Sequence, residues 1–211
     1  MKLSCRLMSA PLVALALSST LSGCVGVSLV TQERSFSSAV DDFNAQTQLN
    51  AMLLGESPSL FANTNLTVIE GRVHMSGTVP TNADRLSATR LAWATPNVKE
   101  VVNDIEVTDT TDIADTARDR WISAQVRGRI LTDRTIHDVN YTIDTQNKVV
   151  YILGIAQDQI ELDRVMAHAR AVPEARRVVN YALLKADPRR FAQPRSGEFE
   201  GAQAAPPSDP H

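Results

Sequence analysis

The hydrophobic positions of the chain follow two periods in turn, that of a helix and that of a strand. In the stretch after residue 37, Ala45, Leu49 and Leu53 recur at helical spacing. Further on, Glu70-Gly71 separates two short runs rich in Val and Ile, which predicts a β-hairpin. The expected elements of this first half are a helix over 38–55, strands over 66–69 and 72–79, a helix over 82–94 and a strand over 98–107.

The same order of residues recurs 77 positions later without a gap. Under this shift Leu54 falls on Leu131, Gly77 on Gly154, and Val101-Val102-Asn103 on Val178-Val179-Asn180. The expected elements of the second half are a helix over 114–132, a strand over 139–144, a turn at 145–147, a strand over 148–155, a helix over 158–171 and a strand over 175–184. Two copies indicate two small domains of α+β class rather than a repeat array.

Each copy therefore reads αββαβ. The hairpin makes its first two strands antiparallel, and the helix before the last strand predicts a crossover that makes the second and third strands parallel. Each domain is expected to be a small mixed three-stranded sheet packed by two helices. We assign the domains to 38–109 and 113–186, and expect the Pro-rich remainder, 187–211, to be a disordered tail.

A unit of this order and size resembles the BON domain. The features that carry the resemblance are Gly77 and Gly154 at the end of the second strand, an acidic residue in the first turn of the next helix, and the repeated Val-Val-Asn. The BON family is periplasmic or membrane-associated and often duplicated. The resemblance implies binding to phospholipid or to other envelope components.

The first 23 residues have the pattern of a bacterial secretion signal. Lys2 and Arg6 precede an apolar run that is too short for a comfortable transmembrane helix, and Leu21-Ser22-Gly23-Cys24 follows. That tetrapeptide resembles the lipobox of bacterial lipoproteins, which implies cleavage before Cys24 and lipidation of its thiol. The alternative is a plain signal peptide with a chance cysteine.

The residues after Cys24 extend this interpretation. Residues 24–37 are expected to form a lipidated tether, rich in Ser, Thr and Gln. Val25 stands where an Asp would suggest retention in the inner membrane, so the sequence favours a lipid anchor in the outer membrane, facing the periplasm. Signal, lipobox and two units together resemble the dual-BON outer-membrane lipoproteins.

Charge separates the two copies. The region 36–109 has nine acidic and four basic residues, whereas 113–186 has nine acidic and eleven basic residues. The first helix of the second copy has gained four arginines, at Arg118, Arg120, Arg127 and Arg129. An anionic surface is the natural partner of such a helix.

Trp121 lies among these arginines, beside the apolar stripe of the helix rather than within it. An indole with neighbouring guanidinium groups suits the headgroup boundary of a membrane. We therefore predict that Trp121 and the four arginines bind anionic phospholipid, a role that the family resemblance also implies for this helix. Two alternatives stay open: Trp121 packs between the domains while the arginines pair with nearby aspartates, or it contacts a partner protein.

The remaining chemistry of the sequence is sparse. The four histidines lack the spacing of a metal site, and no nucleophile or phosphate-loop motif occurs. The net charge of −3 gives no support for nucleic-acid binding. We predict a non-enzymatic protein without cofactor that binds anionic phospholipid and supports outer-membrane integrity. The alternative is a lipid-tethered adaptor of an envelope machine, such as outer-membrane protein assembly or cell division.

Overall fold

The structure is a computed structural model that describes residues 34–108 and 113–194. The signal peptide, Cys24, most of the expected tether and the end of the tail lie outside the described residues.

The first domain has one more helix than the sequence predicts. Its elements are α2 (Phe36–Glu56), α3 (Pro58–Asn63), β1 (Thr64–Ile69), β2 (Arg72–Val79), α4 (Asn82–Ala94) and β3 (Glu100–Val107). Ser57-Pro58 ends α2, as expected, but the Ser57 hydroxyl then accepts the Leu60 N–H and starts α3. Residues 34–37, assigned to the tether, instead belong to α2 and its N-terminal cap, where the Ser35 hydroxyl accepts the Ser38 N–H.

The second domain repeats this plan with two changes. Its elements are α5 (Ile113–Thr132), β4 (Tyr141–Gln146), β5 (Val149–Ala156), α6 (Gln159–Arg170), β6 (Arg177–Asn180) and β7 (Leu183–Leu184), with a short 3₁₀ turn, η1 (Asp138–Asn140), before β4. The hairpin turn is Asn147-Lys148, both at positive φ, rather than 145–147. The last strand is broken after Asn180, whose side-chain oxygen accepts the Ala182 N–H, and both parts pair with β5.

The predicted strand directions are confirmed in both sheets. β1 and β4 run antiparallel to β2 and β5, and β3 and β6 run parallel to them. Gly77 and Gly154 lie near the ends of β2 and β5, as expected, at φ 128° and 136°. A Cβ at either glycine would collide with the carbonyl oxygen of the aligned residues Asn63 and Asn140. Both glycines are therefore required by the fold.

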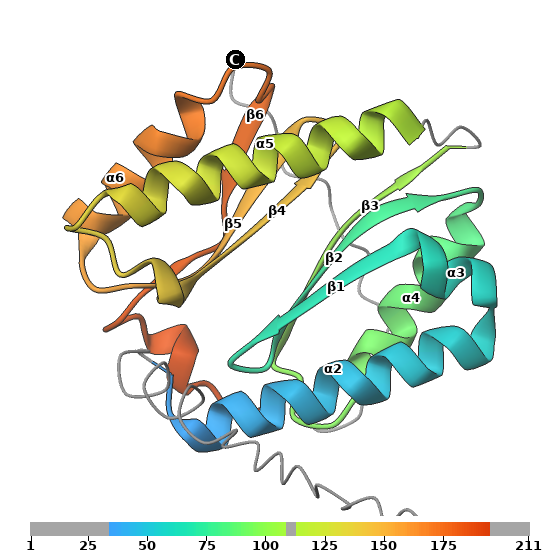
Figure 1. Cartoon of the computed structure of the whole chain (residues 1–211). Helices are drawn as coiled ribbons and strands as arrows, with labels where there is room; N and C mark the ends of the chain where they lie inside the picture. Colours follow the sequence, from blue (N-terminus) through green and yellow to red (C-terminus); the bar gives the residue numbers. More distant parts are fainter. Residues whose placement is uncertain (1–33, 109–112, 195–211) are drawn as a thin grey trace, which may run out of the picture.

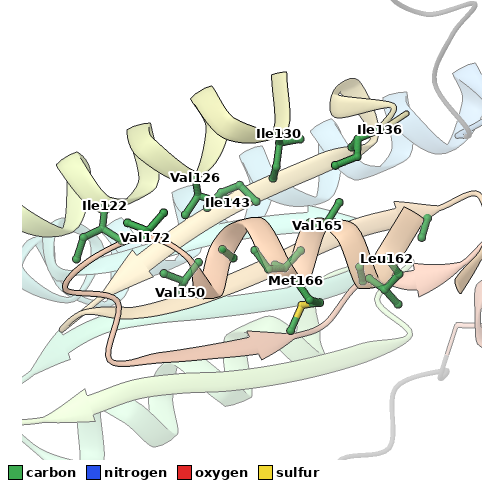
Figure 2. Close-up of a cluster of buried hydrophobic side chains, with 14 residues drawn as sticks. Ile122, Val126, Ile130, Ile136, Ile143, Val150, Leu162, Val165, Met166 and Val172 are labelled. Carbon is green, nitrogen blue, oxygen red and sulfur yellow. The ribbon is translucent and has the colours of Figure 1, made fainter. Parts of the chain in front are cut away.

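Each domain keeps both of its long helices on one face of its sheet. In the first domain, Leu49 and Leu53 of α2 pack with Met75 of β2 in one buried cluster. In the second, Ile122 and Val126 of α5 pack with β5 and α6, and Figure 2 shows these side chains pointing into the space between the helices and the sheet. The predicted core positions of the two first helices are confirmed.

The other faces of the two sheets pack against each other, so that the molecule has four layers with the helices outside (Figure 1). His74 of β2 is buried and lies 4.9 Å from the Tyr151 ring and 5.4 Å from the Tyr181 ring, between ring centroids. Val149 and Leu153 complete the apolar part of this seam.

Polar side chains from the two domains meet around that apolar centre. Ser76 donates a short hydrogen bond to Asp144, and the Gln146 amide donates to Thr78 at 3.1 Å. Arg72 donates to the Tyr181 carbonyl at 2.9 Å. These contacts position the two domains relative to each other, and they bring β4 and α5 next to the edge strand β1.

The beginning of the expected disordered tail is instead ordered. Residues Pro188–Phe191 form a 3₁₀ turn, η2, at the end of the second domain. Arg190 pairs with Glu70 of the first domain at 2.7 Å, and both side chains are less than a tenth exposed. Lys99 also donates to the Arg190 carbonyl at 3.0 Å. The expectation of a disordered tail from residue 187 is wrong for 187–194. The Arg190–Glu70 ion pair holds this segment against the first domain.

Candidate functional site

The five predicted site residues all lie on α5, but the structure divides them between two flanks of the helix. At about 100° per residue, Trp121 and Arg118 share one flank, and Arg120 and Arg127 share the other. Arg129 lies closer to the sheet and is half-buried. The solvent side between the flanks is made of small or apolar exposed residues, Ala117, Ala124, Gly128 and Leu131. We call this surface, with Trp121, Arg118, Arg120 and Arg127, the α5 outer face.

Two large apolar side chains of the α5 outer face are uncovered. Trp121 is 46% exposed and Leu131 is 68% exposed. Trp121 is absent from the apolar cluster that joins the two sheets, which lies on the other side of the second sheet from α5. The structure therefore places Trp121 at the surface of the helical layer and not in the seam between the domains.

The arginines differ in how much of their hydrogen-bonding capacity is used. Arg118 pairs with Glu174 at 3.0 Å, and about half of each side chain remains exposed. Arg127 donates to the Ile143 carbonyl at 2.8 Å, which holds its guanidinium against β4. Within the described ranges, Arg120 makes no ion pair or hydrogen bond. Arg129 likewise makes no side-chain ion pair or hydrogen bond in these ranges, but it is half-buried, so Arg120 is the exposed guanidinium that is open to an anion.

Arg120 and Arg127 also line a cleft of about 550 Å³ between α5, β4 and the edge of the first domain. The cleft is polar: its lining residues are Asn65, Thr116, Asp119, Arg120, Ser123, Ala124, Arg127, Ile143, Asp144, Thr145 and Gln146. Asn65 comes from β1, so the cleft exists only because the two sheets are packed together. No pattern in the sequence indicates this cleft, since it joins residues from both copies.

The two acidic residues in the cleft are already engaged. Asp144 accepts from Ser76, and Asp119 accepts the backbone N–H groups of Asn147 and Lys148 at 2.7 and 2.8 Å. Burial raises the pKa of Asp119, and the two backbone hydrogen bonds oppose that rise. The hypothesis that nearby aspartates pair with the arginines therefore does not describe Asp119, whose oxygens face the hairpin turn.

An equivalent buried carboxylate occurs in the first domain. Asp42 accepts the N–H groups of Glu70 and Gly71 at 2.7 and 2.8 Å, and burial raises its pKa as well. The 77-residue shift places Asp42 on Asp119, but the sequence alone does not indicate what the shared carboxylates do. Both residues hold the hairpin turn against the first helix, so their role is structural.

Groups that other chemistry would need are scarce in the described residues. Within 34–108 and 113–194, no three His, Cys, Asp or Glu side chains gather in a way that would hold a metal ion. No helix in these ranges combines the length and the apolar character needed to cross a membrane. His168 and Arg164 both approach Asp133, and the His168 hydrogen bond is the main cause that lowers the pKa of Asp133.

Both halves of the chain match one known protein family. The family described as "BON domain" matches residues 41–109 and again 118–186. The uncharacterized protein in the gshII 5′ region of Anaplasma centrale is 39% identical over 147 residues, which cover 69% of this chain and 96% of that protein. Outer membrane lipoprotein DolP of Haemophilus influenzae is 26% identical over 139 residues, which cover 65% of this chain and 72% of DolP.

Among solved structures, the chain is similar to CdsD, a structural protein of the type III secretion system of Chlamydia trachomatis. The identity is 12%, the TM-score is 0.28, and the match covers 65% of this chain and 90% of that chain. A score this low supports no inference about this protein.

Proposed function

The chain belongs to the BON-domain family, with one BON unit in each half, and on this basis we propose that it is a non-enzymatic envelope lipoprotein that binds anionic phospholipid through the α5 outer face. Cys24 carries the lipid anchor in the outer membrane, and the folded domains face the periplasm. Binding to the membrane surface in turn supports outer-membrane integrity. The relative DolP, named an outer membrane lipoprotein, supports the location.

One observation carries the proposal: an uncovered Trp lies on a helix whose two flanks are both basic. Trp121, at 46% exposure, offers an apolar ring with one N–H to the headgroup boundary. Arg118 lies on the same flank of α5 as Trp121. Arg120, which has no partner in the described residues, lies on the opposite flank. With guanidinium groups on both sides, the arginines can pair with lipid phosphates while the apolar side chains between them enter the membrane interface.

The acidic residues near the helix do not cancel this surface. Asp119 is buried and its two oxygens face the turn, so it contributes little to the exposed field. Asp133 is turned toward His168 and Arg164 at the end of the helix. Asp115 is exposed in the first turn and Glu174 pairs with Arg118, so the positive charge left exposed along the middle of α5 is mainly that of Arg120 and Arg127.

The experiment uses residues 25–211, which lack the anchor, and vesicles made of neutral or anionic lipid. Trp93→Phe removes the other indole, so that emission reports Trp121. We expect sedimentation with anionic vesicles only, with a blue shift, and weaker binding at high salt because exposed charges are screened. Trp121→Ala should weaken binding about tenfold or more, the effect of losing most of one buried aromatic side chain.

Single arginine changes test the electrostatic part. Each basic residue near an anionic surface contributes about 1 kcal/mol, so Arg120→Gln should weaken binding about fivefold. Arg90→Gln is the matched control: it removes the same charge from α4, where Arg90 pairs with Glu56 at 3.2 Å in the opposite helical layer. Equal effects of the two changes, or no binding to anionic vesicles at all, would overturn the proposal. That result would favour the adaptor hypothesis, with Trp121 in contact with a protein.

A further inference from the structure

The first helix of the first domain also has an uncovered apolar line, of a different kind. Phe36, Val40, Phe43 and Leu54 of α2 are 68%, 41%, 71% and 49% exposed. Their spacings of four, seven and eighteen residues from Phe36 place them on one side of the helix, opposite the core residues Leu49 and Leu53. We call these four residues the α2 outer stripe.

The α2 outer stripe contains no charge, and the helix around it is acidic. The charged residues of α2 are Asp41, Asp42 and Glu56, and the helix has no basic residue. Asp42 is buried at the hairpin turn, and Glu56 pairs with Arg90 of α4. Nothing on this helix would attract an anionic headgroup, so any partner of the stripe must recognise its apolar surface.

The position of α2 in the chain identifies that partner. Phe36 follows Cys24 by twelve residues, and ten residues connect Cys24 to Arg34, where the described structure begins. A fully extended connection of that length spans about 35 Å, and a flexible one averages about 17 Å. If Cys24 is lipidated, the bilayer that holds the anchor is thus always within reach of the stripe.

A short tether also removes most of the entropic cost of bringing the domain to the membrane. Attachment at this length corresponds to an effective concentration of the order of millimolar. Burial of the two phenylalanines and the leucine of the stripe is then sufficient for docking that a free molecule would not show. Interfacial aromatic side chains are typical of such contacts.

We propose that the α2 outer stripe docks the first domain on the same bilayer that holds Cys24, and that this contact does not depend on headgroup charge. The proposal rests on lipidation of Cys24, which is part of the proposed function. Figure 1 shows α2 and α5 in the two opposite outer layers of the molecule. Docking through α2 and binding through α5 are therefore alternative orientations on a flat membrane, and anionic lipid favours the second.

The test places a tryptophan in the stripe. The chain from Cys24 to His211 has one cysteine, Cys24, which is coupled to a maleimide lipid in vesicles of neutral phosphatidylcholine with brominated acyl chains. The reporter is Phe43→Trp in a Trp93→Phe, Trp121→Phe background. Ile160→Trp in the same background is the matched control, because Ile160 is 69% exposed but lies on α6 of the other domain.

We expect the reporter at position 43 to shift to the blue and to lose about half of its emission to the bromine atoms, as an interfacial ring would, whereas the reporter at position 160 stays unquenched. Phe36→Gln should restore emission at position 43. The same signals are expected in high salt.

Three outcomes would overturn the inference. They are no quenching at position 43, equal quenching at positions 43 and 160, and a blue shift that grows with protein concentration without vesicles, which would identify the stripe as a contact between copies of the chain. The proposed function fails separately, in the untethered assay with anionic vesicles. Mass spectrometry of the membrane-bound protein tests lipidation of Cys24 independently of both.

Discussion

Helices α2 and α5 occupy equivalent places in the two domains, yet they resemble each other only on the side that faces the sheet. Ala45, Leu49 and Leu53 correspond to Ile122, Val126 and Ile130, and all six are buried. On the outer side, Phe43 of α2 corresponds to Arg120 of α5, and the two surfaces differ in charge as well as in shape. Duplication has kept what the fold needs and has left the outer surfaces free to diverge.

The same contrast holds for the two faces that meet in the seam. His74 and Ser76 of β2 correspond to Tyr151 and Leu153 of β5. His74 lies against the Tyr151 and Tyr181 rings, and Ser76 donates to Asp144, where the first copy has Thr67. Residues that differ between the copies therefore meet in the seam.

The largest expected effect comes from the shared glycines. Gly154→Ala should destabilise the second domain by about 3 kcal/mol or more, because its φ is 136° and the new Cβ would strike the Asn140 carbonyl. Gly77→Ala should do the same to the first domain. Denaturation followed by Trp93 and Trp121 emission, one indole in each domain, measures the two effects.

Gly128→Ala is the control for these variants. Gly128 is helical, and apart from its chain neighbours and the backbone of its own helix no atom lies within 4 Å of the Cβ position. This change should stabilise α5 by up to about 1 kcal/mol. If Gly77→Ala or Gly154→Ala were as harmless as Gly128→Ala, the equivalence of the two strands would be wrong.

The buried aspartates come next. Asp42→Asn and Asp119→Asn should each destabilise their domain by about 1–3 kcal/mol, because an amide can accept only one of the two turn N–H groups that the carboxylate accepts. Asp41→Asn, at the exposed neighbour of Asp42, should change stability little. A larger loss at one aspartate than at the other would show that the two hairpins are not equally dependent on it.

Alkaline pH should act on the second domain and on its contact with the first in the seam. All three tyrosines, Tyr141, Tyr151 and Tyr181, lie in the second domain, and burial is the main cause that raises the pKa of each. The folded state therefore keeps protons that the unfolded state loses above pH about 10, and stability falls as pH rises further, by up to about 1.4 kcal/mol per pH unit for each tyrosine.

Phenolate absorbance followed with the two indole signals tests this prediction. Phenolate should appear together with unfolding at Trp121, and Tyr151→Phe should reduce the pH dependence. Titration of all three phenols while Trp121 emission stays native would contradict the expected shifts.

The smallest expected effect on stability comes from a variant that distinguishes folding from binding. Arg118→Gln removes an exposed ion pair with Glu174, and such pairs contribute about 0–1 kcal/mol. We therefore expect little change in unfolding but weaker binding to anionic vesicles. A loss of stability well above this range, with unchanged binding, would make Arg118 a structural residue.

Several features can be predicted from the sequence alone: the two αββαβ units, their strand directions, the core side of each first helix and the excess of arginine on α5. These features depend on periodicity, turn residues and repetition, which are local or internal to the chain. The 77-residue shift also contained the Asp42–Asp119 pair, although its meaning needed the structure.

The way in which the two copies meet could not be predicted in this manner. Alternating strand residues such as His74 and Tyr151 indicate two faces, but not which face covers which partner. The cleft between α5 and Asn65 and the Arg190–Glu70 ion pair both depend on that packing. Contacts between distant segments are set by the complementarity of whole surfaces, and that is a property that no local pattern of residues contains.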